Sequence, residues 1–494
     1  MATRAPGIAP EDEDLFSGGV ARSTVRGLAT QMTGTLGLNL LALARGVLLR
    51  RWFLPAELGL LETAQLPLRI TLRLSQLGTR QAVIRSGGRH REVMASALSL
   101  DFLVTSVAYV ALLVGAPLLA RFFHNPVLTP WIRLLAITAY TTTLALPAAA
   151  WDRQMRFGIS KLPRAAGTVA TIAVSAAGAF ILGLGAKSLL WGALAGFVVE
   201  HAAIWILAPY RPRPAWNRQD VRRLVAFSGP LLASAVAGYI VFEADDLMVR
   251  YFRDEAALAL YRAAFEWPYY LTTLVAMTSG VLYPAMTRLE KDAGRRRAFL
   301  RANRYVAMVT IPAGVALAAF AGPLVLFLYG PSWAPSVPLL RLFALAFTAR
   351  VSTGYAWHLL PMARGDTAPL MRVSAGSAAL TLALGLPLIS RLGAEGGALV
   401  NVAVALAWAL PARMWVLRRE LGSLALVADI PRPLIAAAAA ASAVVLVLGE
   451  AGGLAALALR VALYALGYMA VLRLLVPGLV GEARDVVAMA RTQE

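Results

Sequence analysis

The sequence predicts an all-α polytopic membrane protein with about fourteen transmembrane helices. We expect two six-helix lobes related by a parallel pseudo-two-fold repeat, followed by two extra C-terminal helices. Three observations predict this class. The 494 residues are 59% hydrophobic and only 15% charged, and the mean hydropathy is +0.65, whereas a soluble protein is about half apolar and a quarter charged. Long apolar segments recur along the chain, and one half of the sequence resembles the other.

Each predicted span is an apolar segment close to the roughly 20 helical residues that cross a bilayer core. The spans are expected at 28–49, 58–79, 94–120, 131–152, 165–186, 188–209, 224–249, 259–286, 303–322, 336–361, 369–390, 396–417, 433–449 and 454–476. With the N-terminus inside, arginine-rich loops such as RLEKDAGRRRAFLRANR fall on the cytoplasmic side. This asymmetry fits the positive-inside rule. The formal net charge of +20 is therefore explained by topology and by attraction to anionic lipid, and no nucleic-acid partner is expected.

The spans divide the chain into an ordered set of parts. Residues 1–27 are polar and are expected to form a disordered cytoplasmic tail. They lack the apolar core of a secretory signal. Residues 28–209 form the first lobe, 210–223 a basic cytoplasmic linker, and 224–417 the second lobe. Residues 418–476 hold the two extra spans, and 477–494 form a second cytoplasmic tail.

An internal repeat supports the two lobes. Shifting the sequence by 200 residues aligns ARGVLLRRWFLPAELGLLETA, from Ala44, with ADDLMVRYFRDEAALALYRAA, from Ala244. A second pair, APLLARFFHNPVLTPWIRLLAITA and GPLVLFLYGPSWAPSVPLLRLFALA, follows in the same order with two residues inserted. Two ordered matches at nearly one shift indicate a duplication. Each half contains six spans. Because six is an even number, both halves start on the same side of the membrane.

Polar residues within the spans fall on single helical faces. At 100° per residue, one stripe in span 2 holds Glu62, Gln65, Arg69, Arg73, Gln76 and Arg80. Span 1 has Gln31, Thr35, Asn39 and Arg45, and span 8 has Arg262, Glu266, Tyr269 and Thr273. Arg350 lies alone in the middle of span 10. Polar side chains are costly in hydrocarbon, so these faces should meet protein or water.

Charges are inverted at equivalent positions of the repeat. Arg45 aligns with Asp245, and Glu62 aligns with Arg262. The stretch FEADDLMVRYF, from Phe242, concentrates acids in an apolar segment of a basic protein. We expect these acids to face basic groups of the other half across a cavity, with Arg45 as the partner of Asp245. Structural ion pairing inside the bundle is the alternative.

Residues for catalysis or cofactor binding are absent from the pattern. The chain has no cysteine and four histidines without metal-ligand spacing, and it has no GxxxxGK phosphate loop. We therefore expect no metal, no cofactor and no enzyme activity. Paired acids near an outer loop are also found in membrane glycosyltransferases, but the expected outer loops are too short to hold a catalytic domain. A scaffold protein without transport activity is a further alternative, and it would tolerate loss of the buried charges.

The same segments resemble a known family. AELGLLETAQLPLRITLRLSQLGTRQAVIR is similar to the second span of Wzx-type polysaccharide transporters, and FSGPLLASAVAGYIVFEADDLMVRYF with the following helix is similar to their spans 7 and 8. LYGPSWAPSVPLLRLFALA resembles the start of span 10. These transporters belong to the multidrug/oligosaccharidyl-lipid/polysaccharide (MOP) flippase superfamily. The resemblance runs from about residue 28 to about residue 417 and rests on spaced small, aromatic and charged residues.

The resemblance implies an alternating-access flippase that moves an undecaprenyl-pyrophosphate-linked oligosaccharide from the inner to the outer leaflet of the bacterial cytoplasmic membrane. Both termini would be cytoplasmic. Arg45 matches a basic cavity position of related flippases, and Asp245 matches an acid near the end of span 7. Asp246 departs from the family pattern, and Arg262 and Arg350 match no invariant position. A drug/cation antiporter, or a flippase for a peptidoglycan precursor or teichoic-acid unit, remains an alternative.

Roles for the polar residues follow from that substrate. Arginine donors suit a pyrophosphate, and amide, hydroxyl and aromatic groups suit sugars. The predicted substrate-binding set is Asn39, Arg45, Gln65, Arg69, Arg73, Arg262, Tyr269 and Arg350. The predicted set for ion coupling or inter-lobe pairing is Glu62, Asp245, Asp246 and Glu266. Without a nucleotide site, H+ or Na+ is expected to supply the energy, and polysaccharide polymerase machinery is a possible partner.

Overall fold

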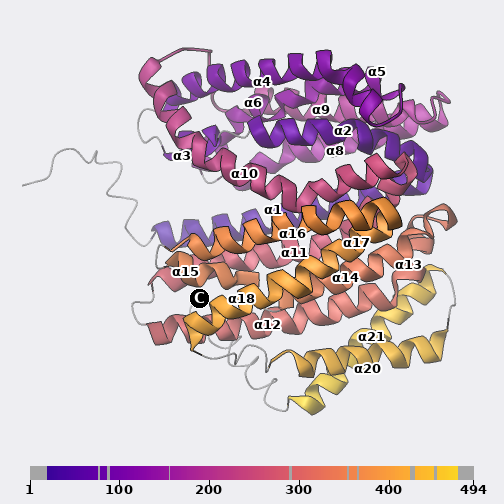
Figure 1. Cartoon of the computed structure of the whole chain (residues 1–494). Coiled ribbons are helices and arrows are strands. Elements are labelled where there is room, and N and C mark those ends of the chain that lie inside the picture. Colours follow the sequence, from indigo (N-terminus) through magenta and orange to yellow (C-terminus); the bar gives the residue numbers. More distant parts are fainter. Residues whose placement is uncertain are drawn as a thin grey trace, which may run out of the picture. The chain divides into compact units, whose positions relative to one another are not determined.

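Helices account for the regular structure of the described chain. The computed structural model describes residues 19–75, 78–85, 90–154, 156–288, 292–352, 355–363, 366–422, 429–449 and 453–476, and no strand occurs among them. Figure 1 shows these helices in sequence colours. The predicted tails at 1–27 and 477–494 lie mostly outside the described residues. The predicted all-α class is confirmed.

The helices of the first part of the chain alternate long segments with short ones. They are α1 (Gly19–Trp52), α2 (Pro55–Ser75), α3 (Thr79–Arg85), α4 (His90–Phe122), α5 (Leu128–Leu135), η3 (Ala136–Tyr140), α6 (Thr141–Leu144), η4 (Leu146–Ala148), α7 (Ala149–Arg153), α8 (Phe157–Phe180), α9 (Lys187–Leu207) and α10 (Arg218–Phe252).

The later helices follow the same pattern and end in a hairpin. They are α11 (Glu255–Arg288), α12 (Asp292–Ala319), α13 (Ala321–Leu328), η5 (Pro331–Trp333), α14 (Ser336–Ser352), η6 (Tyr355–His358), α15 (Leu359–Ala363), α16 (Ala368–Leu392), α17 (Ala394–Ala403), the π-helix η7 (Val404–Ala409), α18 (Leu410–Leu421), α20 (Pro431–Leu448) and α21 (Leu454–Leu475).

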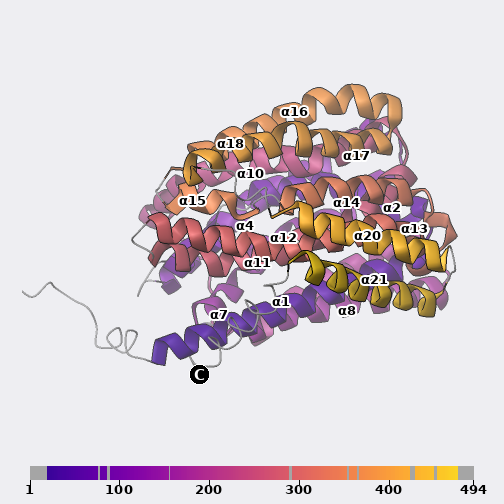
Figure 2. The same ribbon diagram turned by 90° about the horizontal axis from the view of Figure 1, so that it is seen from below.

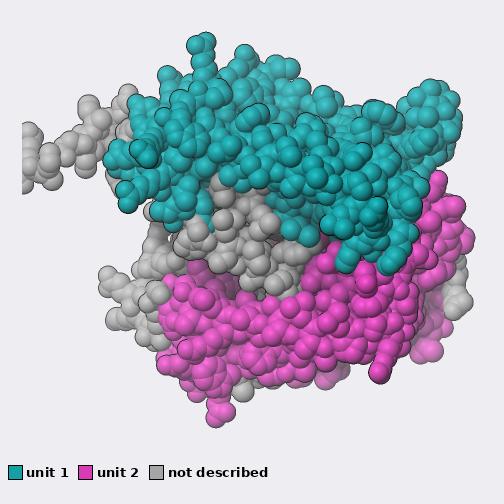
Figure 3. Space-filling view, turned by 45° about the horizontal axis from the view of Figure 1, so that its top comes forward, with its two compact units in different colours: residues 1–49, 64–235 teal, residues 50–63, 236–494 magenta. Residues whose placement is uncertain are grey.

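The chain forms two compact units, coloured separately in Figure 3. Unit 1 comprises residues 1–49 and 64–235, and unit 2 comprises residues 50–63 and 236–494. The end of α1 and the start of α2 thus belong to unit 2, although the chain before and after them belongs to unit 1. This short segment, residues 50–63, is called the crossing segment below.

Small residues let the helices of unit 1 approach closely. A Cβ placed on Gly192 would lie 2.0 Å from the Ser175 hydroxyl, and one on Gly196 would lie 2.0 Å from the Thr171 hydroxyl. Helices α8 and α9 therefore pack backbone to backbone, as helices in lipid do when glycine, serine and threonine line their interface. A separate apolar core joins α3, α4, η4 and α7 around Val83, Met94 and Leu146.

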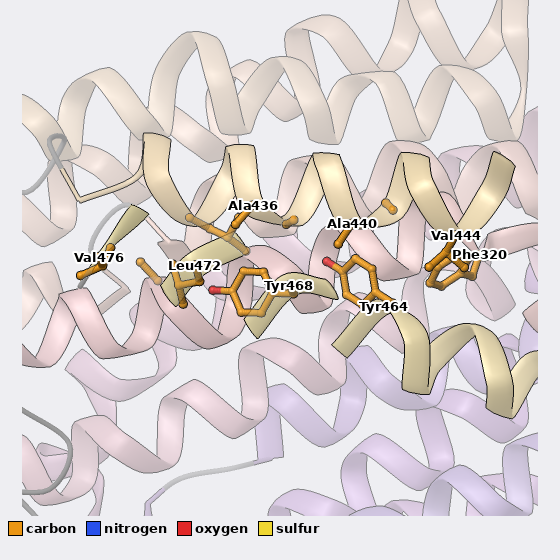
Figure 4. Packing of buried hydrophobic residues seen from close by; sticks show 12 residues of the cluster. Phe320, Ala436, Ala440, Val444, Tyr464, Tyr468, Leu472 and Val476 are labelled. Atoms are coloured by element: carbon orange, nitrogen blue, oxygen red, sulfur yellow. The ribbon is translucent and has the colours of Figure 1, made fainter. Parts of the chain in front are cut away.

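Unit 2 ends in the α20–α21 hairpin, whose helices lie side by side in Figures 1 and 2. The hairpin packs on α12 through Tyr464, Tyr468 and a row of alanines (Figure 4). Pro312 in α12 has no N–H, so the carbonyl of Met308 loses its usual helical partner. The Tyr468 hydroxyl donates to that carbonyl at 2.8 Å, and the Tyr464 hydroxyl donates to the Pro312 carbonyl at 2.8 Å. The tyrosines thus satisfy backbone groups inside an apolar layer.

Eight helical segments in the described residues are long and apolar enough to cross a membrane. They are His90–Phe122, Leu128–Arg153, Lys187–Leu207, Arg296–Ala319, Ala368–Leu392, Ala394–Leu421, Pro431–Leu448 and Leu454–Leu475. Each overlaps a predicted span, which supports a polytopic membrane protein. The full count of fourteen is not confirmed. Helices α1, α2, α10 and α11 occupy four further predicted spans, and these helices carry most of the residues assigned to substrate or coupling.

Helix boundaries follow the predicted repeat. Helix α1 ends at Trp52 and α10 ends at Phe252, while α2 begins at Pro55 and α11 begins at Glu255. Both boundaries differ by the same 200 residues that align the two sequences. The duplication seen in sequence is therefore also seen in structure at these positions, as two long helices joined by a short connection.

Candidate functional site

The crossing segment brings charged residues of α1 and α2 into unit 2. Gly59 permits its close approach, because a Cβ at that position would lie 1.9 Å from the carbonyl oxygen of Glu255 at the start of α11. The buried Arg250 of α10 donates from Nε to the Thr63 hydroxyl at 3.1 Å and pairs with Glu255. The ends of α10 and α11 thus hold the first turns of α2.

Arg262 lies at the centre of the first charged cluster. Its Nη1 is 2.5 Å from Asp246 Oδ2 and 3.6 Å from Glu243 Oε2, and its Nε is 3.6 Å from Glu62 Oε2. The guanidinium therefore joins α10, α11 and the crossing segment. Three carboxylates thus face one guanidinium, and these four side chains form the Arg262 cluster.

Arg50 forms a second cluster one turn further along α11. It pairs with Glu266, and its guanidinium carbon lies 5.1 Å from the ring centroid of Tyr329 and 5.8 Å from that of Trp333. Tyr329 in turn accepts a hydrogen bond from Trp267 Nε1 at 2.7 Å. Arginine stacks on aromatic faces and forms forked ion pairs. The crossing segment is thus held at both of its ends.

Asp245 lies in a third cluster, in which its side-chain hydrogen-bond partners are the uncharged residues Tyr261 and Asn401. Its Oδ2 accepts hydrogen bonds from the Tyr261 hydroxyl at 2.5 Å and from Asn401 Nδ2 at 2.8 Å, and its Oδ1 accepts from the Asp246 N–H at 3.0 Å. All three side chains are buried. Gly397 leaves room for Tyr261, because a Cβ there would lie 2.8 Å from the ring.

The Asp245 cluster lies beside an irregular helical turn. Asn401 is in the last turn of α17, directly before the π-helix η7. Single π-helical turns are frequent at functional sites. Three helices of unit 2, α10, α11 and α17, therefore converge on one buried carboxyl group.

Two further predicted residues of unit 2 differ in setting. Arg350 is partly buried on α14 and its guanidinium carbon lies 5.7 Å from the Phe347 ring centroid. Its Nε has no hydrogen-bond partner among the described residues. Tyr269 on α11 is 46% exposed and stacks with Phe265. Arg350 thus retains a free donor, which an anionic ligand could use.

The remaining predicted substrate residues belong to unit 1. Arg45 is exposed on α1, Asn39 is partly buried on the same helix, and Gln65 and Arg69 are partly buried on α2. Arg73 lies in α2, but its side chain is outside the described part of the chain. The pairing of Arg45 with Asp245 would join the two units and stays a prediction.

The partners of the FEADDLMVRYF acids differ in part from the expectation. Glu243 and Asp246 have their basic partner, Arg262, in the same half of the sequence. Only Glu62 comes from the other half, and it brings a further acid. Inverted charges at positions 62 and 262 thus form an ion pair with each other, because the crossing segment packs against α11.

The comparisons with known proteins now decide the family. The family described as "Polysaccharide biosynthesis protein" matches residues 48–338, which is more than half of the chain. The chain belongs to this family. A relative is the succinoglycan biosynthesis transport protein ExoT of Rhizobium meliloti (strain 1021), with 23% identity over 329 residues. That match covers 64% of the chain and 63% of ExoT, which is less than two thirds of its length.

Solved structures share the fold of this polysaccharide biosynthesis protein. The lipid II flippase MurJ in an inward closed conformation has a TM-score of 0.78 at 14% identity, covering 91% of this chain and 99% of MurJ. An inward-facing MATE family multidrug transporter of the MOP superfamily has a TM-score of 0.60 at 14% identity, covering 79% and 98%. The chain thus has the fold that the sequence resemblance implied, the fold of these two transporters.

Sequence reasoning missed several residues of these clusters. Arg50 aligns with Arg250 in the repeat, but it falls just outside the predicted span 28–49 and was assigned no role. Its burial at 8% was signalled only by that alignment. Tyr261, Tyr329 and Asn401 had no such signal, because an isolated tyrosine or asparagine in an apolar helix does not reveal its distant partner.

Proposed function

We propose that this polysaccharide biosynthesis protein is a flippase for lipid-linked oligosaccharides. It would move an undecaprenyl-pyrophosphate-linked glycan from the inner to the outer leaflet of a bacterial cytoplasmic membrane by alternating access, with both termini cytoplasmic. The family match over residues 48–338 carries the proposal, and the fold shared with MOP superfamily structures supports it. Undecaprenyl carriers, the bilayer and polysaccharide polymerase machinery are its proposed partners.

Arginines that are not enclosed by acids are the proposed pyrophosphate ligands. A guanidinium binds phosphate oxygens through two parallel N–H donors. Arg45 is exposed and Arg350 has an unused Nε donor. Arg69 and Arg73 lie on the same face of α2 as Gln65, four residues before Arg69. We assign sugar contacts to Gln65, Asn39 and Tyr269.

Arg262 fits a different role from the one expected. A pyrophosphate approaching it would meet Glu62, Glu243 and Asp246 within 3.6 Å of the guanidinium, and like charges repel strongly in a low-dielectric interior. We therefore assign Arg262 to holding the crossing segment. Binding of H+ or Na+ to Glu62, Asp245, Asp246 or Glu266 would supply coupling, since one charge moved through 100 mV yields about 2.3 kcal/mol.

The first experiment measures translocation in liposomes. Reconstituted protein would be given an undecaprenyl-pyrophosphate-linked disaccharide, and the fraction reaching the opposite leaflet would be followed. Arg45→Ala is expected to lower the rate at least tenfold, because one charge-assisted contact is worth about 1.5–3 kcal/mol. Arg51→Ala is the matched control, because Arg51 is exposed in the crossing segment and is assigned no substrate contact.

Charge reversal tests the inter-unit pair in the same assay. If Arg45 meets Asp245 during transport, Arg45→Asp and Asp245→Arg should each abolish it, and the double reversal should restore it. Efflux of a cationic dye without glycan transport would instead support the drug/cation antiporter. Equal rates in wild type and Arg45→Ala would contradict the assignment of Arg45.

A further inference from the structure

Unit 1 contains a buried carboxyl group with a single hydrogen bond. Asp101 on α4 is 2% exposed, and its Oδ2 accepts a hydrogen bond from the Thr79 hydroxyl at 2.8 Å. Its Oδ1 is buried and has no partner among the described residues. The same elements, α3 and α4, contribute Val83 and Leu98 to an apolar core that also includes Leu146.

No cation neutralises Asp101 in the described part of the chain. On the neighbouring elements, Arg80 of α3 pairs with Asp152 of α7 at 2.5 Å, and Arg153 of α7 donates to the Ile84 carbonyl. Arg91 of α4 lies over the Tyr210 ring. The buried His201 contacts the Phe197 and Thr141 carbonyls, and the described acids Glu92, Glu200 and Asp220 cannot neutralise a carboxylate.

Further polar groups continue from Asp101 into the unit. Thr105 lies one turn along the same face of α4, and its hydroxyl is 3.0 Å from that of Thr143 in α6. Both threonines are 1% exposed. Two residues earlier in α6, the Thr141 carbonyl lies 3.3 Å from Nε2 of the buried His201. Further buried polar groups, the Thr105–Thr143 hydroxyl pair and His201, thus lie along α4, α6 and α9 beyond Asp101, and none of these described groups hydrogen-bonds to its carboxyl group.

The protonation state of Asp101 follows from these contacts. An ionised carboxylate with one hydrogen bond and no cation in an apolar core carries a large desolvation penalty. A neutral carboxylic acid avoids that penalty and keeps the bond from Thr79. We propose that Asp101 is a proton-binding site of unit 1, which holds a proton in this conformation and releases it when the carboxyl group reaches water.

As a coupling site, Asp101 depends on the proposed transport function, but as a proton-binding site it does not. Release of its proton would leave a carboxylate that must be hydrated or paired. Thr79 is the first residue of α3 and donates its hydrogen bond to Asp101 of α4, so separation of α3 from α4 would break this bond and give water access to the carboxyl group. Protonation and closure of that contact would then favour each other.

Infrared spectroscopy tests proton binding without any transport assay. Wild-type protein in lipid nanodiscs should show, at neutral pH, the carbonyl stretch of a protonated carboxylic acid. Asp101→Asn should remove this band, whereas Asp254→Asn should retain it. Asp254 is the matched control because it is exposed and uses a side-chain oxygen that asparagine also offers to the Ala257 N–H.

A second variant guards against misfolding of the first. In Thr79→Val the Asp101 band should persist at higher frequency, because a hydrogen bond to a carbonyl lowers its stretching frequency. An unchanged band in both Asp101→Asn and Thr79→Val would overturn the proposal. So would the absence of any protonated carboxyl band across the pH range in which the protein is folded.

The liposome assay then separates the two proposals. If glycan transport in wild type responds to an imposed pH gradient and transport in Asp101→Asn does not, Asp101 is the coupling site. The same response in both proteins would overturn the coupling role. An Asp101 band in a protein that moves no lipid-linked glycan would support proton binding while contradicting the proposed function.

Discussion

At the scale of single residues, the neighbouring Arg50 and Arg51 differ in burial: Arg50 is a buried member of an ion pair, whereas Arg51 is exposed. Arg50 is 8% exposed between Glu266, Tyr329 and Trp333. Arg51 is exposed, and its Nη1 donates to the Phe327 carbonyl at 3.5 Å. Removing one partner of a buried ion pair leaves the other charge uncompensated, which typically costs about 3–5 kcal/mol.

The two arginines therefore give a matched test. Arg50→Gln should lower the free energy of unfolding by about 3–5 kcal/mol, because Glu266 is left without its cation, and Arg51→Gln should change it by less than about 0.5 kcal/mol. The thermal midpoint of the purified protein in detergent measures both changes. Arg50→Lys should fall between them, since lysine keeps the charge but loses the planar stack. Equal losses in the two glutamine variants would show that Arg50 is not held as described.

At the scale of helices, the repeat boundary depends on the close approach of α2 to α11. Gly59 and Ala259 occupy equivalent positions, and a Cβ on Gly59 would meet a neighbouring backbone atom, the Glu255 carbonyl oxygen. A backbone atom cannot move aside as a flexible side chain can. The sequence difference between the two halves at this position is thus a packing requirement.

Adding one methyl group tests this requirement. Gly59→Ala should destabilise unit 2 by about 1–3 kcal/mol through overpacking. Gly115→Ala should instead be neutral or stabilising by up to about 1 kcal/mol, because Gly115 lies inside α4 with nothing near its Cβ position. Thermal midpoints of the two variants, measured side by side, check the difference. A stable Gly59→Ala protein would contradict the close contact between α2 and Glu255.

Helical periodicity predicted the polar face of α11 but not the partners of that face. Arg262 and Glu266 were placed on one stripe by a spacing of four residues, and both form ion pairs. The stripe does not reveal that Glu62 pairs with Arg262 and Arg50 with Glu266, because these partners are about 200 residues away in sequence. Asn401 was missed for the same reason: its contact with Asp245 spans 156 residues. Local patterns report which residues share a face, and long-range packing decides what the face meets.

At the scale of the whole chain, the crossing segment is where the polypeptide passes from unit 1 into unit 2 and back. Residues 50–63 are fixed in unit 2 by Arg50, Arg250 and Arg262. The proposed alternating transport would require such contacts to change in at least one state. Ion pairs suit this role, because a partner in another state can replace them, whereas an apolar seal would have to be exposed.

Removal of Arg262 should therefore release the crossing segment. In Arg262→Gln, Glu62 would face Glu243 and Asp246 without the cation between them, and repulsion would favour opening.

Since the chain has no cysteine, a single Leu61→Cys can report opening through its rate of labelling by a maleimide. Leu61 is 7% exposed and Leu54 is 56% exposed, so Leu54→Cys is a control that should label rapidly in both backgrounds. Arg262→Gln should label Leu61→Cys about tenfold faster, which corresponds to about 1.4 kcal/mol of opening free energy. If Leu61→Cys already labels as fast as Leu54→Cys in the presence of Arg262, the segment is open without any change in charge, and the ion pairs do not control it.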